Sequence, residues 1–334
     1  MAGDKKPGRV LSGMRPSGKL HLGHLHGVLE NWLRLQEQYE CYFFVADWHA
    51  LTTEYQDPKG IRDNIAEMVI DWLSVGIDPL RSVIFRQSEI KEHAELFVLL
   101  SMITPLSWLE RNPTYKEQIA EVKDRDIHTF GFLGYPVLQT ADIIIYMAEK
   151  VPVGIDQAPH IELAREITRR FNYFYGETFP EPQTLMTESP KVLGTDGRKM
   201  SKSYNNAIYL SDPPDAIEKK ILTMTTDTAR VKKTDPGNPD VCPVFISFHR
   251  HYSGTDTMEW VKEGCTTAAI GCIECKKSVI PAVLERLKPV REKRMELSRN
   301  PEKVWGVIRE GTMRADAVAK KTMYGVRKAM GIGF

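Results

Sequence analysis

Apolar residues recur with two different periods along the first part of the chain. Short, mostly apolar runs at residues 10–12, 42–45 and 82–85 predict strands that are buried on both faces. Over residues 25–33 and 65–73, apolar positions return every three or four residues, which predicts a helix after each of the first two strands. Strands that alternate with helices over connections of this length are typical of a parallel, doubly wound sheet. The expected fold class is therefore α/β.

The later part of the chain changes from mixed to helical patterning. Residues 136–148 and 157–175 have helical spacing and flank a short strand at residues 151–153. Beyond them the pattern favours helices alone. We therefore expect an α/β domain over residues 1–205 and a mainly α-helical domain over residues 206–334, whose last helix can pack back on the first domain.

The charge balance does not by itself indicate nucleic-acid binding. The chain has 45 Lys and Arg residues against 44 Asp and Glu residues, so any nucleic-acid contact would depend on local basic patches. The N-terminus is polar and charged, which does not fit a signal peptide, and the apolar stretches are too short to cross a bilayer. We expect a cytoplasmic protein without a membrane partner.

The tetrapeptide His21-Leu22-Gly23-His24 stands between a strand–turn segment and the first helix. A helix N-terminus offers N–H groups and the positive end of the helix dipole, which suits an anion. Gly23 lets a ligand approach the backbone closely, and the two imidazoles can donate to phosphate or sugar oxygens. From this motif alone, two ordinary histidines at a helix start remain an alternative.

A second motif follows a turn that contains two glycines, and it reads Lys199-Met200-Ser201-Lys202-Ser203. Two lysines in such a loop can move onto the phosphates of a nucleotide. There they would neutralise the charge that develops as pyrophosphate leaves. Taken alone, the segment has a solvated basic loop as its alternative.

Together, the two motifs resemble the HIGH and KMSKS signatures of class I aminoacyl-tRNA synthetases, whose catalytic domain is Rossmann-like. Within that class the chain resembles the bacterial-type tryptophanyl-tRNA synthetases over nearly its whole length. The resemblance implies a homodimeric enzyme that activates L-tryptophan with ATP and Mg²⁺ and transfers it to tRNA(Trp). The segments that carry it are residues 12–18, 47–52, 135–143, 151–157, 160–165 and 326–331.

The resemblance also implies the residues of the site. Asp142 matches a carboxylate that accepts the indole N–H, a group that can only donate; the alternative is a carboxylate on a helix surface. The other tryptophan-binding positions are Tyr135, Gln139, Gln157 and His49. The catalytic positions are His21, His24, Lys199 and Lys202. The ATP-binding positions are Arg15, Pro16, Ser17, Gly23, His24, Gly154, Ile155, Asp156, Val192, Lys199, Met200, Ser201, Lys202 and Ser203.

Three positions depart from the common pattern of that family. Arg15 stands where many members have Gln, and Gln139 stands where many bacterial members have Met. Ile155 stands where Glu is common, so only its backbone can serve ATP. Lys116 is a further candidate for the pyrophosphate side, with a plain surface lysine as the alternative.

Four of the five cysteines lie within about a tenth of the chain, with the spacing C-x22-C-x6-C-x2-C. A cluster that ends in CxxC in a cytosolic protein indicates a metal site rather than disulfides, and four thiolates suit zinc or an iron–sulfur cluster. The spacing resembles that of a subset of tryptophanyl-tRNA synthetases with a [4Fe–4S] cluster in the anticodon-binding domain. Zinc and free thiols are the alternatives. The four are Cys242, Cys265, Cys272 and Cys275.

Basic residues close to this cluster in the sequence are candidates for contact with the tRNA backbone, which favours Lys and Arg through counterion release. The alternative is a solvated helix face. The candidates are Arg230, Lys232, Lys233, Lys276 and Lys277.

Three other functions fit part of these observations. A tyrosyl-tRNA synthetase shares the fold, and Asp142 could accept a phenol O–H instead. A non-catalytic RNA-binding protein with a redox-sensing cluster would keep the fold without an intact KMSKS motif. A different adenylyl transferase would form no tRNA product.

Overall fold

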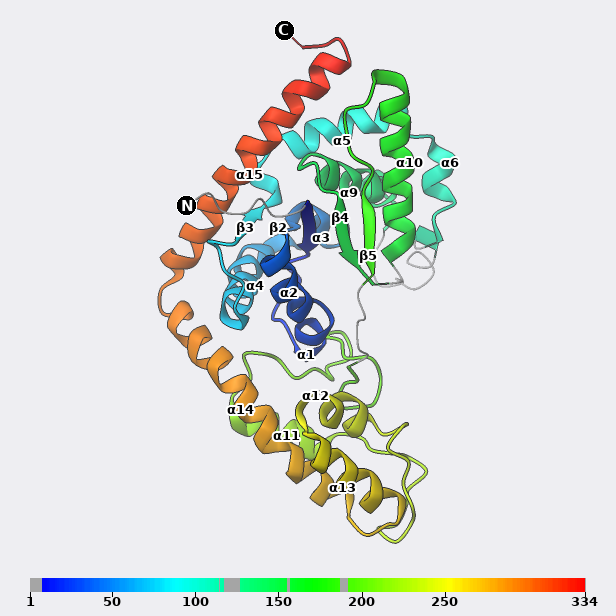
Figure 1. The fold of residues 1–334 in the computed structure, drawn as a ribbon, viewed down its shortest axis with the longest axis vertical. Helices are drawn as coiled ribbons and strands as arrows, with labels where there is room; N and C mark the ends of the chain where they lie inside the picture. The colour runs from blue at the N-terminus through cyan, green and yellow to red at the C-terminus, as the bar shows by residue number, and fades with distance from the viewer. Residues whose placement is uncertain (1–7, 114, 117–126, 155–156, 187–191, 334) are drawn as a thin grey trace.

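The computed structural model describes residues 8–113, 115–116, 127–154, 157–186 and 192–333. Its centre is a five-stranded parallel sheet with the strand order β3-β2-β1-β4-β5 (Figure 1). The order reverses its direction at β1, as a doubly wound sheet requires, so the α/β expectation is confirmed. The strands are β1 (Arg9–Met14), β2 (Glu40–Val45), β3 (Ser82–Arg86), β4 (Lys150–Val153) and β5 (Gln183–Met186).

Helices cover both faces of this sheet. Successive side chains of a strand point to opposite faces, so the buried strand β2 contributes to two cores. On one face Phe43 stacks on Trp32 of α2, and Trp32 in turn contacts Trp72 of α4. Tyr42 and Phe44 belong to a second core, with residues of α5, α9, α10 and α15, on the other face. Burial on both faces explains why β2 is an unbroken apolar run rather than an alternating one.

The helices before β5 connect the strands and carry most of the candidate site residues. They are α1 (Leu22–His24), α2 (Glu30–Gln38), α3 (Asp47–Glu54), α4 (Ile61–Val75), α5 (Glu92–Ile103), α6 (Leu106–Glu110), α8 (Phe130–Leu133), α9 (Tyr135–Ile144) and α10 (Ala158–Tyr175). Short π- or 3-10 segments lie at Leu25–Leu29, Pro58–Gly60 and Gln87–Glu89.

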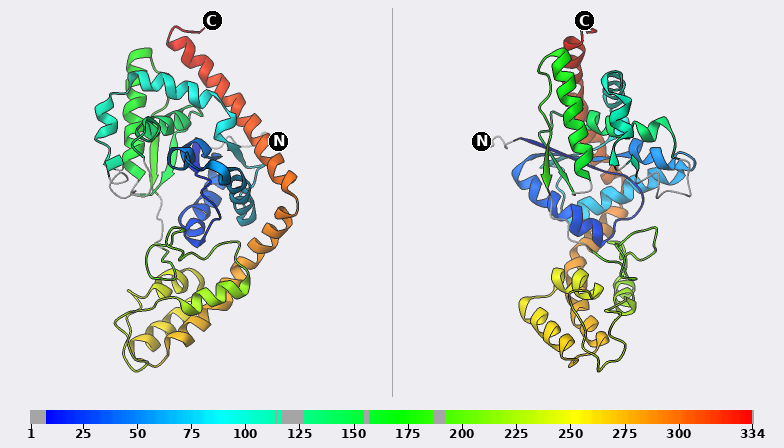
Figure 2. Two further views of the ribbon diagram at one scale, coloured as in Figure 1. Left: turned by 180° about the vertical axis from the view of Figure 1, so that it is seen from behind. Right: turned by 90° about the vertical axis from the view of Figure 1, so that its right-hand side faces the viewer.

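The part of the chain after β5 is helical, as its pattern predicts. Two long helices run along one edge of the molecule, from the outer helical part back to the sheet (Figures 1 and 2). Helix α14 packs on α4, and α15 packs on β3 and α5, where Arg327 forms an ion pair with Glu95. The helices are α11 (Pro214–Thr223), α12 (Arg250–Tyr252), α13 (Thr255–Thr266), α14 (Cys272–Ser298) and α15 (Pro301–Ala329), with a π segment at Phe245–His249.

The sequence pattern does not predict strand β5. This strand pairs with β4 at the edge of the sheet, and its residues are half-buried or exposed. It therefore lacks the apolar run that identified strands β1, β2 and β3. Among the described residues, no helix has the length and apolar character that crossing a membrane requires.

Candidate active site

The histidines of the first motif cap a helix with their own rings. His21 is the N-cap of α1, and its Nδ1 accepts from the backbone N–H of Gly23 at 3.1 Å. Nδ1 of His24 accepts from the backbone N–H of His21 at 3.2 Å. Since each Nδ1 is an acceptor, a neutral ring carries its proton on Nε2 and can donate it to a ligand.

The electrostatic setting keeps both rings neutral. Burial lowers the pKa of His21 to about 4, and the nearby ammonium of Lys202 lowers it further in the same direction. The pKa of His24 is also well below its ordinary value, because of burial first, and then because a proton on His24 would be repelled by Lys202 and by any proton on His21. The motif therefore offers two N–H donors without added positive charge, next to a lysine that supplies it.

The second motif lies directly on the first. Leu193 and Lys199 pair as an antiparallel bridge, and the Met200 N–H donates to the carbonyl of Val192 at 3.0 Å, which closes a hairpin. Met200 is buried, and its Cβ lies 3.8 Å from where a Cβ on Gly23 would be. A side chain at Gly23 would lie 2.9 Å from the His21 ring, so the capping position of His21 requires glycine there, while the contact with Met200 is an ordinary van der Waals contact.

The buried side chain of Asn206 holds this loop in shape through hydrogen bonds. Its side chain is 1% exposed, and Oδ1 accepts from the Ser201 N–H at 2.8 Å. Nδ2 donates to Asp196 Oδ1 at 2.7 Å and to the Lys199 carbonyl at 3.2 Å. One amide therefore satisfies polar groups on both arms of the hairpin.

Lys202 points from the loop to the turn after β1. Its Nζ donates to the hydroxyl of Ser17 at 3.4 Å and is 3.6 Å from the Cβ position of Gly18. Burial lowers the pKa of Lys202 to about 8, although the carboxylates of Asp71 and Glu54 act in the opposite direction. A partly desolvated ammonium of this kind gains much when an anion such as phosphate binds beside it.

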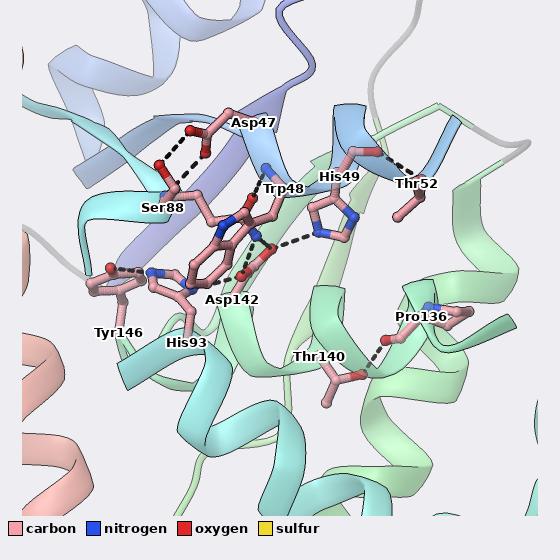
Figure 3. A network of polar contacts seen from close by, with 11 residues as sticks. Asp47, Trp48, His49, Thr52, Ser88, His93, Pro136, Thr140, Asp142 and Tyr146 are labelled. Carbon is pink, nitrogen blue, oxygen red and sulfur yellow. Dashed lines mark hydrogen bonds and ion pairs between the residues drawn. The ribbon is translucent and has the colours of Figure 1, made fainter. Parts of the chain in front are cut away.

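Asp142 is the centre of a buried polar network on α9 (Figure 3). The side chains of Asp142, Gln87 and His93 are fully buried, and His49 is 4% exposed. His49 Nε2 donates to Oδ2 at 2.8 Å, and His93 Nδ1 donates to Oδ1 at 2.6 Å. Gln87 Nε2 donates to both oxygens, at 2.9 and 2.8 Å.

This network holds the carboxyl group ionised. Burial alone would raise the pKa of Asp142, but the hydrogen bonds and charges of His49 and His93 outweigh burial and lower the pKa below its ordinary value. The alternative that Asp142 is a carboxylate on a helix surface does not apply, because its exposure is 0%.

Aromatic rings and one arginine surround this carboxylate. The ring of Tyr135 lies edge-on to His49, with centroids 4.5 Å apart. Burial raises the pKa of Tyr135. The charge of Arg15 lowers this pKa and the charge of Asp142 raises it, so both residues are within electrostatic reach of the phenol. Gln139 is half-buried, and its Oε1 has no hydrogen-bond partner among the described residues.

The remaining candidates follow the carboxyl ends of the strands, where open α/β sheets bind ligands. Arg15, Pro16 and Ser17 follow β1, Gly154 follows β4, and Gln157 precedes α10. Ile155 and Asp156 lie outside the described residues. Lys116 is exposed.

Comparison with known proteins decides between the families that share this fold. The model of the class I tRNA synthetases (W and Y) matches residues 4–288. This chain belongs to that family. The "Tryptophan--tRNA ligase" of Thermotoga maritima is 54% identical over 328 residues, with 98% of this chain and 100% of the relative covered. That of Ralstonia nicotianae is 45% identical over 398 residues, with 98% and 99% covered.

The solved structures agree with this assignment. The tryptophanyl-tRNA synthetase of Campylobacter jejuni, complexed with ADP and tryptophan, superposes with a TM-score of 0.87 at 33% identity, covering 97% of this chain and 99% of that one. The tyrosyl-tRNA synthetase of Archaeoglobus fulgidus superposes with a TM-score of 0.66 at 22% identity, which indicates the shared fold alone. The expectation of an aminoacyl-tRNA synthetase that ligates tryptophan to tRNA is confirmed.

Sequence reasoning missed three residues of the candidate site. Gln87 and His93 both bind Asp142, and Asn206 organises the 199–203 loop. Gln87 carries a usable signal, because it directly follows the strand β3, at the edge of the sheet where ligands bind. His93 and Asn206 carry no comparable signal, since each lies among residues of a helix or loop without a recognisable motif.

The four cysteines of the predicted metal site gather between the Phe245–His249 segment, α13 and α14. Burial raises the pKa of Cys275 to about 12, and the charges of Cys242, Cys265 and Cys272 raise it too, so the four thiols lie within electrostatic reach of one another. The guanidinium of Arg230 lies 4.0 Å from Sγ of both Cys265 and Cys272. Within the described ranges, however, no group of three or more His, Cys, Asp or Glu side chains has an arrangement that could hold a metal ion.

One tRNA candidate near this cluster is wrong. Lys276 is 5% exposed, and its Nζ donates to the carbonyls of Leu222 at 2.8 Å and Met224 at 2.5 Å. An ammonium held by two buried carbonyls cannot reach a phosphate. Lys232, Lys233 and Lys277 instead line a surface hollow of about 600 Å³ beside Arg230 and Cys272.

Proposed function

We propose that tryptophan is activated in the pocket at the carboxyl ends of β1 to β4. In the proposed step, the carboxylate of tryptophan attacks the α-phosphorus of ATP in line. The bond to the bridging oxygen then breaks, and pyrophosphate leaves. Mg²⁺ bound to the phosphates would neutralise part of their charge. A ribose hydroxyl at the 3′ end of tRNA(Trp) next attacks the adenylate carbonyl, and AMP leaves. No protein nucleophile takes part.

The observation that carries this assignment is the contact of the two motifs. Neutral His21 and His24 present Nε2–H donors beside the ammonium of Lys202, whose charge lowers the pKa of both rings. Such preorganised donors stabilise charge that develops on phosphate oxygens. We assign His21, His24, Lys199 and Lys202 to this task, with Arg15 and Ser17 on the same side of the pocket.

On the amino-acid side, we assign the indole N–H to the carboxylate of Asp142. An ionised, buried acceptor discriminates strongly against ligands that lack a donor at that point. Tyr135, Gln139, Gln157 and His49 complete the tryptophan pocket in this assignment. The support is the burial of Asp142 and the set of donors that keep it ionised.

Pyrophosphate exchange with tryptophan, followed by charging of tRNA(Trp), tests these roles. Lys202→Ala should lower exchange at least about a hundredfold, as expected for loss of one donor to developing charge. Lys219→Ala, an exposed lysine on α11, is the matched control and should exchange as the unchanged enzyme does. Exchange driven by tyrosine alone would overturn the substrate assignment, and equal rates for both lysine variants would overturn the role of Lys202.

We also propose that Cys242, Cys265, Cys272 and Cys275 hold a [4Fe–4S] cluster in the helical part. The support is the grouping of the four thiols, which lie within electrostatic reach of one another, and their CxxC spacing, which suits thiolate ligation. The cluster would then fix α13 and α14 around it. Iron, sulfide and zinc analysis of anaerobically purified protein tests this: about four irons per chain support a cluster, one zinc replaces it with a structural zinc site, and no metal overturns both.

The remaining parts of the proposal concern assembly and tRNA. We propose a catalytic domain over residues 1–205, an anticodon-binding domain over residues 206–334, a cytoplasmic location, and a homodimer that tRNA bridges. Exposed apolar side chains on α5, α6 and α8 support an interface between two copies. Light scattering should give twice the mass of one chain, and a monomer at micromolar concentration would overturn the dimer. The apolar side chains are Val98, Met102, Leu106 and Phe130.

A further inference from the structure

The carboxylate of Asp142 has no acceptor position left for an indole N–H. A carboxylate has about four lone-pair positions. Oδ1 accepts from Gln87 and His93, and Oδ2 accepts from Gln87 and His49. Tryptophan can therefore bind through its N–H only if one of these three donors moves away.

Gln87 and His93 are both fixed at a second atom. Gln87 Oε1 accepts from the Trp48 N–H at 3.1 Å, and its neighbour Ser88 donates its N–H to Asp47 Oδ1 at 3.0 Å. His93 Nε2 lies 2.6 Å from the hydroxyl of Tyr146, which is itself fully buried. Nδ1 of His93 contacts Asp142 and Nε2 contacts this hydroxyl, so both nitrogens of the ring have hydrogen-bond partners.

His49 differs from them in this respect. Its second ring nitrogen, Nδ1, has no hydrogen-bond partner among the described residues, although the side chain is buried. Its ring lies edge-on to Tyr135, with centroids 4.5 Å apart, and it approaches Asp142 from a different side than His93 does (Figure 3). Moving the His49 ring therefore breaks a single hydrogen bond, whereas moving Gln87 or His93 breaks two or more.

We propose that His49 occupies the indole acceptor position of Asp142 in the free enzyme and that the indole N–H of tryptophan displaces it, while Gln87 and His93 stay in place as positioning residues. This proposal rests on the assignment of Asp142 as the indole acceptor. In the empty pocket His49 keeps a buried charge paired, which would otherwise be costly. In the complex the hydrogen bond to Asp142 is exchanged rather than added, and Gln87 and His93 keep the carboxylate ionised and oriented.

Binding of two ligands at pH 8 separates the two roles. L-tryptophan and β-(3-benzothienyl)-L-alanine have similar shapes, but sulfur replaces the N–H in the second ligand. In His49→Phe, a ring of similar size no longer competes for Asp142, so both ligands should bind about tenfold more tightly and their affinity ratio should not change. In His93→Phe the carboxylate loses a fixed donor, so the ratio in favour of tryptophan should fall about tenfold or more.

Conservative variants distinguish the loss of a hydrogen-bond donor from a general folding defect. His93→Gln keeps an N–H donor and should restore part of the ratio, and Tyr146→Phe should lower it less than His93→Phe does. His160→Phe is the matched control, because His160 is also buried and packs on Tyr135 but bonds to Asn112 instead of Asp142. It should leave the ratio unchanged.

The nitrogen resonances of ¹⁵N-histidine in the unaltered enzyme give an independent test. Addition of tryptophan should change the signal of His49 strongly and that of His93 little. Three results would overturn the proposed exchange of His49 for the indole N–H. They are weaker tryptophan binding in His49→Phe, an unchanged affinity ratio in His93→Phe, and a large shift of the His93 signal without one at His49. An unchanged ratio in Asp142→Asn would instead overturn the underlying indole assignment, so the two failures are distinguishable.

Discussion

Gly311 lies where helix α15 crosses strand β3, and it has no room for a side chain. A Cβ at this position would be 1.8 Å from the carbonyl oxygen of Ile84 and 2.6 Å from its carbonyl carbon. The obstructing atoms belong to the backbone of a strand, so they cannot turn aside as a flexible side chain would. We therefore expect Gly311→Ala to push α15 away from the sheet.

Two opposing effects set the magnitude. A close carbon–oxygen contact is usually about 3.3–3.6 Å long, so the helix must shift by roughly 1.5 Å or more. Overpacking of this kind costs about 1–3 kcal/mol and occasionally more, whereas alanine stabilises a helix interior over glycine by about 1 kcal/mol. Since α15 also buries Ala315, Ala319 and Met323 in the core beside β3, a shift loses those contacts as well. We expect a net loss of roughly 2 kcal/mol of unfolding free energy.

Urea unfolding of paired variants measures this difference. Gly325→Ala is the matched control, because Gly325 is in the same helix and no atom lies within 4 Å of its Cβ position. It should be unchanged or more stable by up to about 1 kcal/mol. Because Ile84 lies three residues before Gln87, Gly311→Ala should also raise the KM for tryptophan. Equal midpoints for the two variants would refute the argument.

Three further predictions concern the loop and the tie between α4 and α14. The pKa of Lys202 lies near 8, and the ammonium is the form that pairs with phosphate, so the rate of exchange at low ATP should fall as pH rises through 8. Lys202→Arg should move this fall to higher pH. The same pH profile for both enzymes would contradict the role of Lys202. Asn206→Ala leaves the backbone groups of Ser201 and Lys199 without this hydrogen-bond partner. It should lower the exchange rate about tenfold with little change in tryptophan affinity. An unchanged rate would count against the role of Asn206 in organising the loop. Arg294→Met removes the cation 3.0 Å from buried Asp71 and should cost about 3–5 kcal/mol in denaturant unfolding at pH 8. Burial raises the pKa of the Asp71 carboxyl to about 6, so this loss should shrink as pH falls through 6 and the carboxyl takes up a proton; a pH-independent loss would contradict it.

The sequence by itself determined the parts that depend on local chemistry. The central strands follow from apolar runs, and the helices follow from their spacing. The capping role of His21 is local too, since its cap hydrogen bonds involve Gly23 and His24. The 199–203 motif directly follows the glycine-containing turn at residues 194–198, which is visible in the sequence. For these elements the residues that matter are neighbours along the chain, so their pattern is visible without a fold.

Only the tertiary structure decided the contacts between distant segments. Asp142 is held by Gln87 and His93, which lie 55 and 49 residues before it, and neither has a local motif. Strand β5 has no apolar pattern, because its side chains stay half-buried or exposed, whereas β3 at the other edge of the sheet is covered by α15. Lys276 looked like a surface lysine and is instead buried against two carbonyls. In each case burial and pairing, which arise only when the chain is folded, set the role of the residue.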